Sequence, residues 1–242
     1  MKAFLLAPAL LVLVLASDAS ASDELASPSQ DWSGPYIGLT AGWSHSRTKV
    51  IDLTGEEFGD DTPGASLAFT TDGLGVGGTI GYNFQRGSFV FGPEIDFGIA
   101  TNKDTHLVED EGDGAYTNYN FSGSFALRAG YAFSRTLIFA KAGLALAKIR
   151  SAGGEFDGIG DEDSDGKWGF DGDESGFGDK TRAGWLIGAG VEHLLLNGWS
   201  LKLEYTYADF GEKTYTDLEG DGADYKFEDH FHNVRLGMNY HF

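Results

Sequence analysis

Apolar and polar residues alternate along several stretches of this chain. Over residues 73–84 one face is apolar and the other is Gly, Thr and Asn, the apolar set being Leu74, Val76, Ile80, Tyr82 and Phe84. A period of two residues is typical of a β-strand whose faces meet different environments, whereas an α-helix repeats every ~3.6 residues. The same reading predicts eight strands, at residues 36–45, 73–84, 89–99, 120–133, 137–148, 182–194, 199–207 and 234–242.

The last predicted strand has alternating apolar residues and ends on an aromatic, Phe242, two residues after Tyr240. A strand with lipid on one face and a polar lumen on the other needs this alternation. A terminal Phe after alternating apolar residues also resembles the signal that the outer-membrane assembly machinery reads. Tyr240 and Phe242 are therefore predicted to act as an assembly signal and as interfacial anchors.

The first residues have the features of a secretory signal peptide. Lys2 is followed by an almost wholly apolar run over residues 3–15, and Ala19-Ser20-Ala21 is a small-x-small cleavage site. The apolar run is shorter than the ~20 residues of a membrane-spanning helix. We expect a cleaved signal peptide at residues 1–21, a short periplasmic segment at 22–35 and a barrel domain at 36–242.

The chain carries a net charge of −20 and has no cysteine, so disulfides do not hold it together and nucleic acid is not an expected partner. Nearly all of the net charge falls in segments between predicted strands, at 44–71, 101–119, 150–181 and 211–231. Tight turns are predicted for the other links. The sequence thus predicts an all-β, eight-stranded antiparallel transmembrane β-barrel with short periplasmic turns and four long acidic extracellular loops.

Two further expectations concern the wall of this barrel. Pro93 lies inside a predicted strand, where its missing N–H predicts a bulge. Aromatic residues are expected to ring both membrane interfaces. The periplasmic ring would comprise Tyr36, Phe84, Phe89, Phe133, Trp199, Tyr240 and Phe242, and the outer ring Trp43 and Trp185.

Charged residues occur on the strand faces opposite the aromatics. Strand phase directs four acids and four bases inward: Glu94, Asp96, Glu192, Glu204, Arg128, Lys141, Lys202 and Arg235. A buried charge is tolerable only when it is paired and hydrogen-bonded, and an eight-stranded interior has room for little more than side chains. These residues predict a packed ionic plug. The strand that contains Lys141 alternates least clearly.

Four segments carry a resemblance to a known group of proteins. They are Asp31-Trp32-Ser33-Gly34-Pro35-Tyr36-Ile37-Gly38, residues 184–192 (GWLIGAGVE), residues 199–211 (WSLKLEYTYADFG) and residues 232–242 (HNVRLGMNYHF). Together they resemble the small alphaproteobacterial outer-membrane β-barrel group, a porin family of surface antigens with the architecture of the OmpA transmembrane domain. The resemblance implies a place in the outer membrane of a Gram-negative bacterium, with lipid, lipopolysaccharide and the assembly machinery as partners.

Two motifs could bind ligands. Residues 161–166 (DEDSDG) have the spacing of a calcium loop, but Gly172 stands where its bidentate Glu would be. Weak calcium binding by Asp161, Asp163, Asp165 and Asp171 is one interpretation, and a solvated acidic loop is the other. His230 and His232, where the last loop is expected to meet the last strand, could ligate a metal or heme, which some members of the resembled group are reported to bind; hydrogen-bonded rim histidines are the alternative.

No catalytic motif stands out, and the inward carboxylates each have a candidate basic partner, so we do not expect an enzyme. Two functions remain open. The protein could be a structural surface protein whose acidic loops hosts or phage recognise, or a small diffusion pore, which the Gly-rich inward faces favour. A receptor for heme or a divalent cation is a third possibility. No other cofactor is expected.

Overall fold

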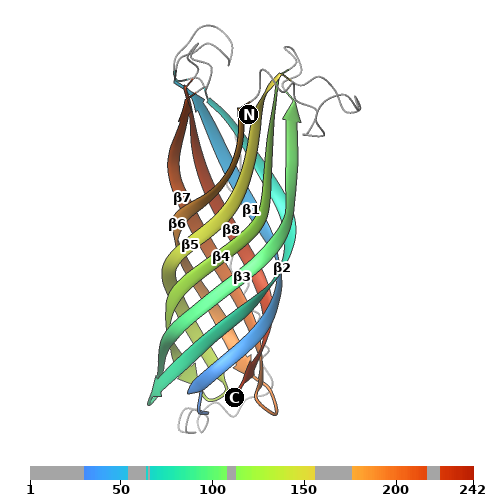
Figure 1. The fold of residues 1–242 in the computed structure, drawn as a ribbon. Helices are drawn as coiled ribbons and strands as arrows, with labels where there is room; N and C mark the ends of the chain where they lie inside the picture. Colours follow the sequence, from blue (N-terminus) through green and yellow to red (C-terminus); the bar gives the residue numbers. More distant parts are fainter. Residues whose placement is uncertain (1–29, 54–63, 65, 108–112, 156–175, 217–223) are drawn as a thin grey trace, which may run out of the picture.

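The computed structural model describes residues 30–53, 64, 66–107, 113–155, 176–216 and 224–242. They form one closed barrel of antiparallel strands, in which each strand pairs with the next and β8 pairs with β1 (Figure 1). The strands are β1 (Gly34–Asp52), β2 (Ser66–Arg86), β3 (Phe89–Leu107), β4 (Asp113–Phe133), β5 (Thr136–Glu155), β6 (Gly176–Leu194), β7 (Trp199–Thr216) and β8 (Asp224–His241). The predicted eight-stranded antiparallel barrel is confirmed. Within the described residues, no helix has the length and apolar character needed to cross a membrane.

Tight turns join the strands at one end of the barrel, which we call the turn end. The β2–β3, β4–β5 and β6–β7 turns each place a residue in the left-handed region: Gly87 (φ 63°), Ser134 (φ 50°), Asn197 (φ 58°) and Gly198 (φ 79°). Gly and Asn adopt this conformation at low cost, which explains why the chain reverses direction there. The opposite end, where β1–β2, β3–β4, β5–β6 and β7–β8 are linked, we call the far end.

The strands continue well beyond the predicted boundaries toward the far end. Much of residues 44–71, 101–119, 150–181 and 211–231, which the sequence predicts as long loops, is strand; β1, for example, runs to Asp52 and β5 to Glu155. These loop boundaries were wrong. The alternation of apolar and polar residues ends where both faces of a strand become polar, whereas the backbone ladder needs no such contrast and continues.

The far end differs from the turn end in its backbone pairing. In the described residues the β2–β3 ladder reaches only Gly75–Ala100, and the β6–β7 ladder reaches only Trp185–Asp209. The other ladders run on, so that β7, β8, β1 and β2 form one group and β3 to β6 another. Toward the turn end every strand is therefore hydrogen-bonded to both neighbours. Toward the far end the described residues leave two gaps in the pairing on opposite sides of the barrel, between β2 and β3 and between β6 and β7, which we call the seams.

Pro93 does not produce the predicted bulge. The register between β2 and β3 is the same on both sides of it, with Gly81 opposite Glu94 and Phe84 opposite Phe91. Pro93 keeps its place in the ladder to β4, opposite Leu127. The register shifts lie elsewhere, between Ile99 and Asn102, between Tyr119 and Phe121, and between Asp209 and Glu212. The missing N–H is thus accommodated by an interruption of one ladder without an extra residue.

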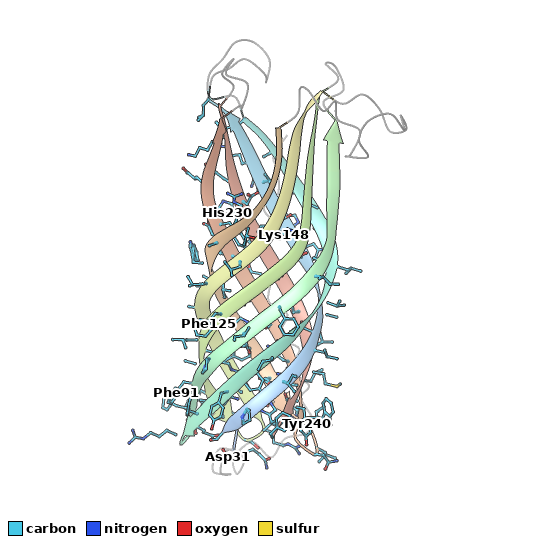
Figure 2. The ribbon with its side chains drawn as sticks, in the orientation of Figure 1. Asp31, Phe91, Phe125, Lys148, His230 and Tyr240 are labelled. Carbon is cyan, nitrogen blue, oxygen red and sulfur yellow. The ribbon has the colours of Figure 1, made fainter. Side chains whose placement is uncertain are left out.

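A band of exposed apolar side chains surrounds the barrel from the turn end to mid-height (Figure 2). It begins with aromatic residues such as Phe84, Phe91, Tyr131 and Trp199 and continues through aliphatic ones such as Leu39 and Leu127. Toward the far end its last members include Trp43, Leu74, Leu146, Trp185 and Val234. Such a band, with aromatic residues around the turn end, is typical of the lipid-facing surface of a transmembrane barrel.

Candidate functional site: the ionic cluster in the lumen

The structure brings all eight predicted luminal charges together inside the barrel. Seven of them are at most 3% exposed, and the side chain of Arg235 is 23% exposed. We call the set the luminal cluster: Glu94 and Asp96 on β3, Arg128 on β4, Lys141 on β5, Glu192 on β6, Lys202 and Glu204 on β7, and Arg235 on β8. Its members come from six strands, so the cluster crosses the whole lumen.

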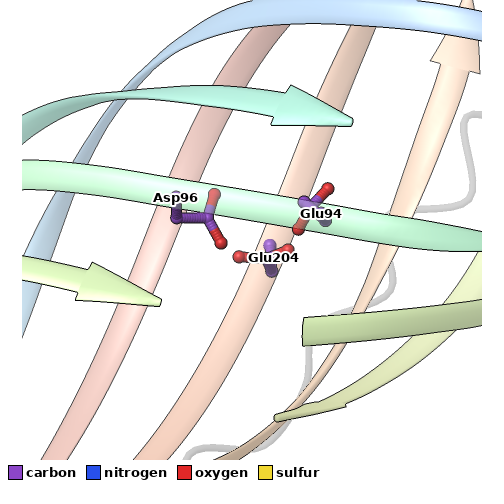
Figure 3. Close-up of side chains that lie close together, drawn as sticks. All are labelled: Glu94, Asp96 and Glu204. Carbon is purple, nitrogen blue, oxygen red and sulfur yellow. The ribbon is translucent and has the colours of Figure 1, made fainter. Parts of the chain in front are cut away.

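The ammonium group of Lys141 lies among three carboxylates that converge from β3 and β7 (Figure 3). Its Nζ is 2.7 Å from Glu94 Oε1, 2.7 Å from Asp96 Oδ2 and 2.9 Å from Glu204 Oε2. The three carboxylates offer oxygen atoms that lie within 4.8 Å of one another, a grouping that could hold a metal ion. Lys141 already contacts each carboxylate, so a side-chain cation satisfies this grouping.

Arg128 joins this grouping to a second carboxylate nearer the turn end. Its guanidinium donates to Glu94 Oε2 at 3.2 Å and to Glu192 Oε2 at 2.8 Å. The same group lies over the rings of Tyr36 and Phe139, 5.1 and 4.6 Å from their centroids. Both charged hydrogen bonds and cation–π contacts strengthen in a dry interior. Arg128 is therefore the link between the two parts of the cluster.

Glu192 and Asp96 have neutral as well as charged partners. Glu192 Oε1 accepts from Ser200 at 2.6 Å and from Asn239 at 2.7 Å. Asp96 Oδ1 accepts from Thr79 at 2.7 Å. Lys202 Nζ lies 3.2 Å from Glu94 and 3.6 Å from Glu204, and Arg235 binds both Asp96 and Glu204. The predicted one-to-one pairs are thus replaced by a shared network.

The glycines of the inward face do not leave the lumen empty. A Cβ at Gly81 would collide with the Tyr36 ring, and one at Gly38 would collide with the Asn239 carboxamide. Large side chains from the neighbouring strand therefore lie directly on these glycines. The Gly-rich inward faces had favoured a pore, but at Gly81 and Gly38 the missing side chain leaves room for Tyr36 and Asn239 to pack inside the lumen.

Trp32 closes the turn end of the lumen. It is 1% exposed and belongs to a buried apolar cluster with Val90, Ala132, Leu137, Phe139 and Leu194. Its backbone N–H donates to Gln85 Oε1 at 2.6 Å. Next to it, the Ser33 N–H donates to Asp31 Oδ1 at 2.8 Å, and this hydrogen bond lowers the pKa of the Asp31 carboxyl below its usual value. The segment before β1 is therefore fixed beneath the luminal cluster.

A small cavity lies on the far side of the cluster. It measures about 100 Å³ and is lined by polar residues such as Asp96, Asn233 and Arg235 and by the rings of Phe210 and Phe231. Arg182 and Asp229 form a buried ion pair inside the barrel, and Asp229 also accepts from Thr48 at 2.7 Å. The cavity therefore lies between the luminal cluster and the far end, and the cluster separates it from the turn end.

Sequence reasoning missed several members of this site. Tyr36, predicted in the periplasmic aromatic ring, is 1% exposed and donates to Glu94 Oε2 at 2.8 Å. That assignment was wrong, because the phase that points Ile37 outward points Tyr36 inward. Arg182 and Asp229 share the phase of Leu186 and Phe231, which are also buried. Strand phase already pointed Arg182 inward, at the first residue of its predicted strand, and would have found Asp229 if the last strand had been extended past residue 234.

The predicted assembly-signal residues lie away from the lumen. Tyr240 contacts Trp199 and Phe242, with ring centroids 5.2 and 5.0 Å apart, on the outer face at the turn end. Their role in assembly stays a prediction. Asp161, Asp163, Asp165 and Asp171 lie outside the described residues, as does the predicted signal peptide.

His230 and His232 lie within β8, and not at its junction with a loop as predicted. Their Nδ1 atoms are 3.0 Å from Tyr207 Oη and 2.7 Å from Tyr205 Oη. Both belong to the outward-facing residues of β8, which include the exposed Val234 and Leu236. The predicted heme or metal role is not settled by these contacts and stays a prediction.

The sequence matches the family described as Outer membrane protein beta-barrel domain over residues 7–242. The chain belongs to this family. It is 32% identical over 233 residues to the 31 kDa outer-membrane immunogenic protein of Brucella melitensis, covering 95% of this chain and 91% of that protein. It is 29% identical over 216 residues to the 22 kDa outer membrane protein of Rhizobium leguminosarum bv. viciae, covering 89% and 80%.

Among solved structures, OprG from Pseudomonas aeruginosa superimposes with a TM-score of 0.49 at 11% identity, covering 87% of this chain and 97% of OprG. The family and the two relatives place the protein in the outer membrane of a Gram-negative bacterium, as the resemblance implied. The names of these relatives describe outer-membrane proteins and an antigen, and neither names an enzyme.

Proposed function

We propose that this protein is a closed outer-membrane barrel with a structural and surface-display role, and that it does not conduct solutes. The luminal cluster carries this proposal. Side chains from six strands meet at mid-lumen, and seven of the eight charges are nearly inaccessible to solvent. A diffusion pore needs a continuous aqueous path, and a barrel of eight strands offers little width beyond its own side chains.

The charge balance supports a structural role for the cluster. Four carboxylates face four basic groups, and Arg182 and Asp229 add one of each sign nearer the far end. A carboxylate left buried without a partner would be costly, so the network holds the barrel in one arrangement only while it is complete.

In our proposal the turn end faces the periplasm and the far end faces outside. Short periplasmic turns and longer outer connections are the rule for such barrels, and the three tight turns all lie at one end. The acidic segments predicted from the sequence would then be displayed on the cell surface, where hosts or phage could contact them. The Brucella relative is named as an immunogenic protein, which favours surface display.

The apolar band supports our proposal that outer-membrane lipid and lipopolysaccharide surround the barrel wall. Tyr240 and Phe242, at the turn end, are the residues we assign to recognition by the assembly machinery. Our proposal includes weak calcium binding at the cell surface by the carboxylates of Asp161, Asp163, Asp165 and Asp171.

Solute flux into proteoliposomes tests the proposal. Vesicles that contain the refolded protein should swell no faster in isotonic arabinose than vesicles without protein, because the luminal cluster blocks even a small sugar. A known general porin at the same molar ratio is the positive control. Rapid swelling with this protein would overturn the closed-barrel proposal and favour the diffusion pore.

A further inference from the structure

A group of outward-facing aromatic and imidazole rings lies at the far border of the apolar band. We call it the outer ring cluster: Trp43 and His45 on β1, Trp185 on β6, Tyr205 and Tyr207 on β7, and His230 and His232 on β8. Its rings are in continuous contact. The centroids of Trp43 and His45 are 5.7 Å apart, those of His45 and His232 are 6.3 Å apart, and those of His232 and Tyr207 are 5.2 Å apart. Tyr207 in turn contacts Trp185 at 5.6 Å.

Among the side chains that the structure describes, the outer ring cluster occupies one side of the barrel. At the same border β2 presents Leu74 and then Asp72, and β5 presents Leu146 and then Lys148. Figure 2 shows His230 and Lys148 toward the same end of the barrel, with Tyr240 and Asp31 at the other. An aromatic belt that served only to anchor the barrel would have no reason to gather its imidazoles on two adjacent strands. The asymmetry points to a specific contact.

Two cationic side chains continue this surface toward the far end. Arg47 and Lys49 follow His45 on the outward face of β1, and Arg47 lies opposite His230 in the register with β8. Among the described residues the nearby acids have other partners. Asp72 lies 2.8 Å from His45, Asp209 lies 3.6 Å from His230, and Glu212 and Glu228 lie 2.5 and 3.7 Å from Lys226. Within that part of the chain, Arg47 and Lys49 have no ion pair.

This combination is unusual on a protein with a net charge of −20. A strongly acidic protein repels free anions at long range. Arg47 and Lys49, which have no ion pair among the described residues, are therefore better suited to an anionic group that the membrane already holds at this height, such as a lipid headgroup. The guanidinium of Arg47 can bind a phosphate with two parallel hydrogen bonds. The flat faces of Trp43 and Tyr207 suit the C–H face of a sugar ring, and the aliphatic residues below suit acyl chains.

We infer that the outer ring cluster, with Arg47 and Lys49, binds the phosphorylated glucosamine headgroup of a lipopolysaccharide molecule in the outer leaflet. The inference rests on the proposed orientation, in which the far end faces outside. The order of groups along the wall matches that of the ligand. Acyl chains lie against Val234 and Leu236, the glucosamine lies against the aromatic rings, and a phosphate is bound by Arg47 with His230 beside it.

Lipid binding to the refolded barrel in detergent tests the inference. Native mass spectrometry and the thermal midpoint are followed with three probes: bis-phosphorylated lipid A, the same lipid A after dephosphorylation, and phosphatidylglycerol. We expect one bis-phosphorylated lipid A per barrel, bound at least about tenfold more tightly than the dephosphorylated form, which is the effect of losing one charged hydrogen bond. Phosphatidylglycerol should bind as weakly as the dephosphorylated form.

The Arg47→Ser/His230→Gln variant should lose this tenfold preference, while Lys148→Ser, which removes an outward cation on β5, should keep it. All of these side chains are outside the lumen, and the gel mobility of unboiled protein confirms that each variant is folded. Equal binding of the phosphorylated and dephosphorylated lipids, equal binding of phosphatidylglycerol, or an equal loss in Lys148→Ser would overturn the inference. Solute flux has no part in this readout, so its failure is distinct from failure of the closed-barrel proposal.

Discussion

The two halves of this barrel are built from the same eight strands but held together differently. Toward the turn end every strand is paired on both sides, apolar residues face lipid, and a network of buried charges fills the lumen. Toward the far end the β2–β3 and β6–β7 ladders stop, and the outward residues include His45, Asp72 and Lys148. Toward the turn end, the strands are specified by the alternation of lipid-facing apolar residues with lumen-facing polar ones; we call this part the closed half. Toward the far end, in what we call the far half, backbone hydrogen bonding alone extends the strands.

The largest effect is expected at Arg128, because the half of the barrel nearer the turn end depends on the luminal cluster. Arg128→Ala leaves Glu94 and Glu192 with fewer basic partners in a dry interior, and we expect a loss of about 3–5 kcal/mol in the free energy of unfolding. The matched control is Arg47→Ala in the far half, where the guanidinium is exposed and the expected change is within about 0.5 kcal/mol. Urea unfolding in detergent micelles measures both. Equal, small losses would contradict a stabilising role for the cluster.

Trp32→Ala removes the side chain that closes the turn end. Burial of this ring against Leu137 and Phe139 predicts a loss of about 3 kcal/mol, the lower end for a buried Trp. Trp43→Ala, on the outward face, is the control and should cost less, because the ring is 44% exposed. Protease cleavage near residue 30 should also become faster in Trp32→Ala. No difference between the two variants would show that Trp32 is not a fixed closure.

Lys141→Met converts the centre of the luminal cluster into a possible cation site. The three carboxylates around Lys141 would repel one another once the ammonium is gone, and we expect a destabilised barrel in EDTA. Millimolar calcium should restore part of the loss, because three converging carboxylates supply the oxygen ligands that it prefers. Lys202→Met is the control, since Lys202 contacts only two of these carboxylates. Equal calcium effects on the two variants would count against the convergent geometry.

The smallest expected effect is a difference in hydrogen exchange at the seams, which locates the boundary between the two halves of the barrel. In β2, the amides of residues 66–74 that face β3 should exchange with deuterium faster than those of residues 75–81, because among the described residues the former have no ladder partner on that side. The amides that face β1 should be protected throughout, since that ladder extends to Ile51–Ser66. Residue-resolved exchange by NMR in micelles makes this measurement. Uniform protection on both sides would show that the seam is closed.

Much of the closed half could be predicted from the sequence, and the reason is physical. Alternation gave the strand phase, and the phase directed all eight luminal charges inward, including Lys141 from the strand that alternates least clearly. The same phase also placed Tyr36 inward, but its aromatic character favoured an interfacial position and misled the assignment. Phase is therefore more informative than residue type for a strand that borders a narrow lumen.

The far half could not be predicted in the same way. Past Trp43 and Val234 both faces of β1 and β8 carry polar residues, so no alternation marks the continuing strands. The network geometry was also beyond the sequence, because phase tells which charges point inward but not which of them share a partner. Lys141 contacts three carboxylates only because the closed sheet brings β3, β5 and β7 around one point.

Single-channel recording in planar bilayers tests the central claim, that the luminal cluster closes the barrel, most directly. The wild-type protein is predicted to give a closed baseline, and so is Lys148→Ser, which leaves the lumen intact. Arg128→Ala combined with Trp32→Ala, which removes the link in the cluster and the closure at the turn end, is predicted to show openings. A steady cation-selective conductance of wild-type protein, unchanged in the double variant, would contradict the claim.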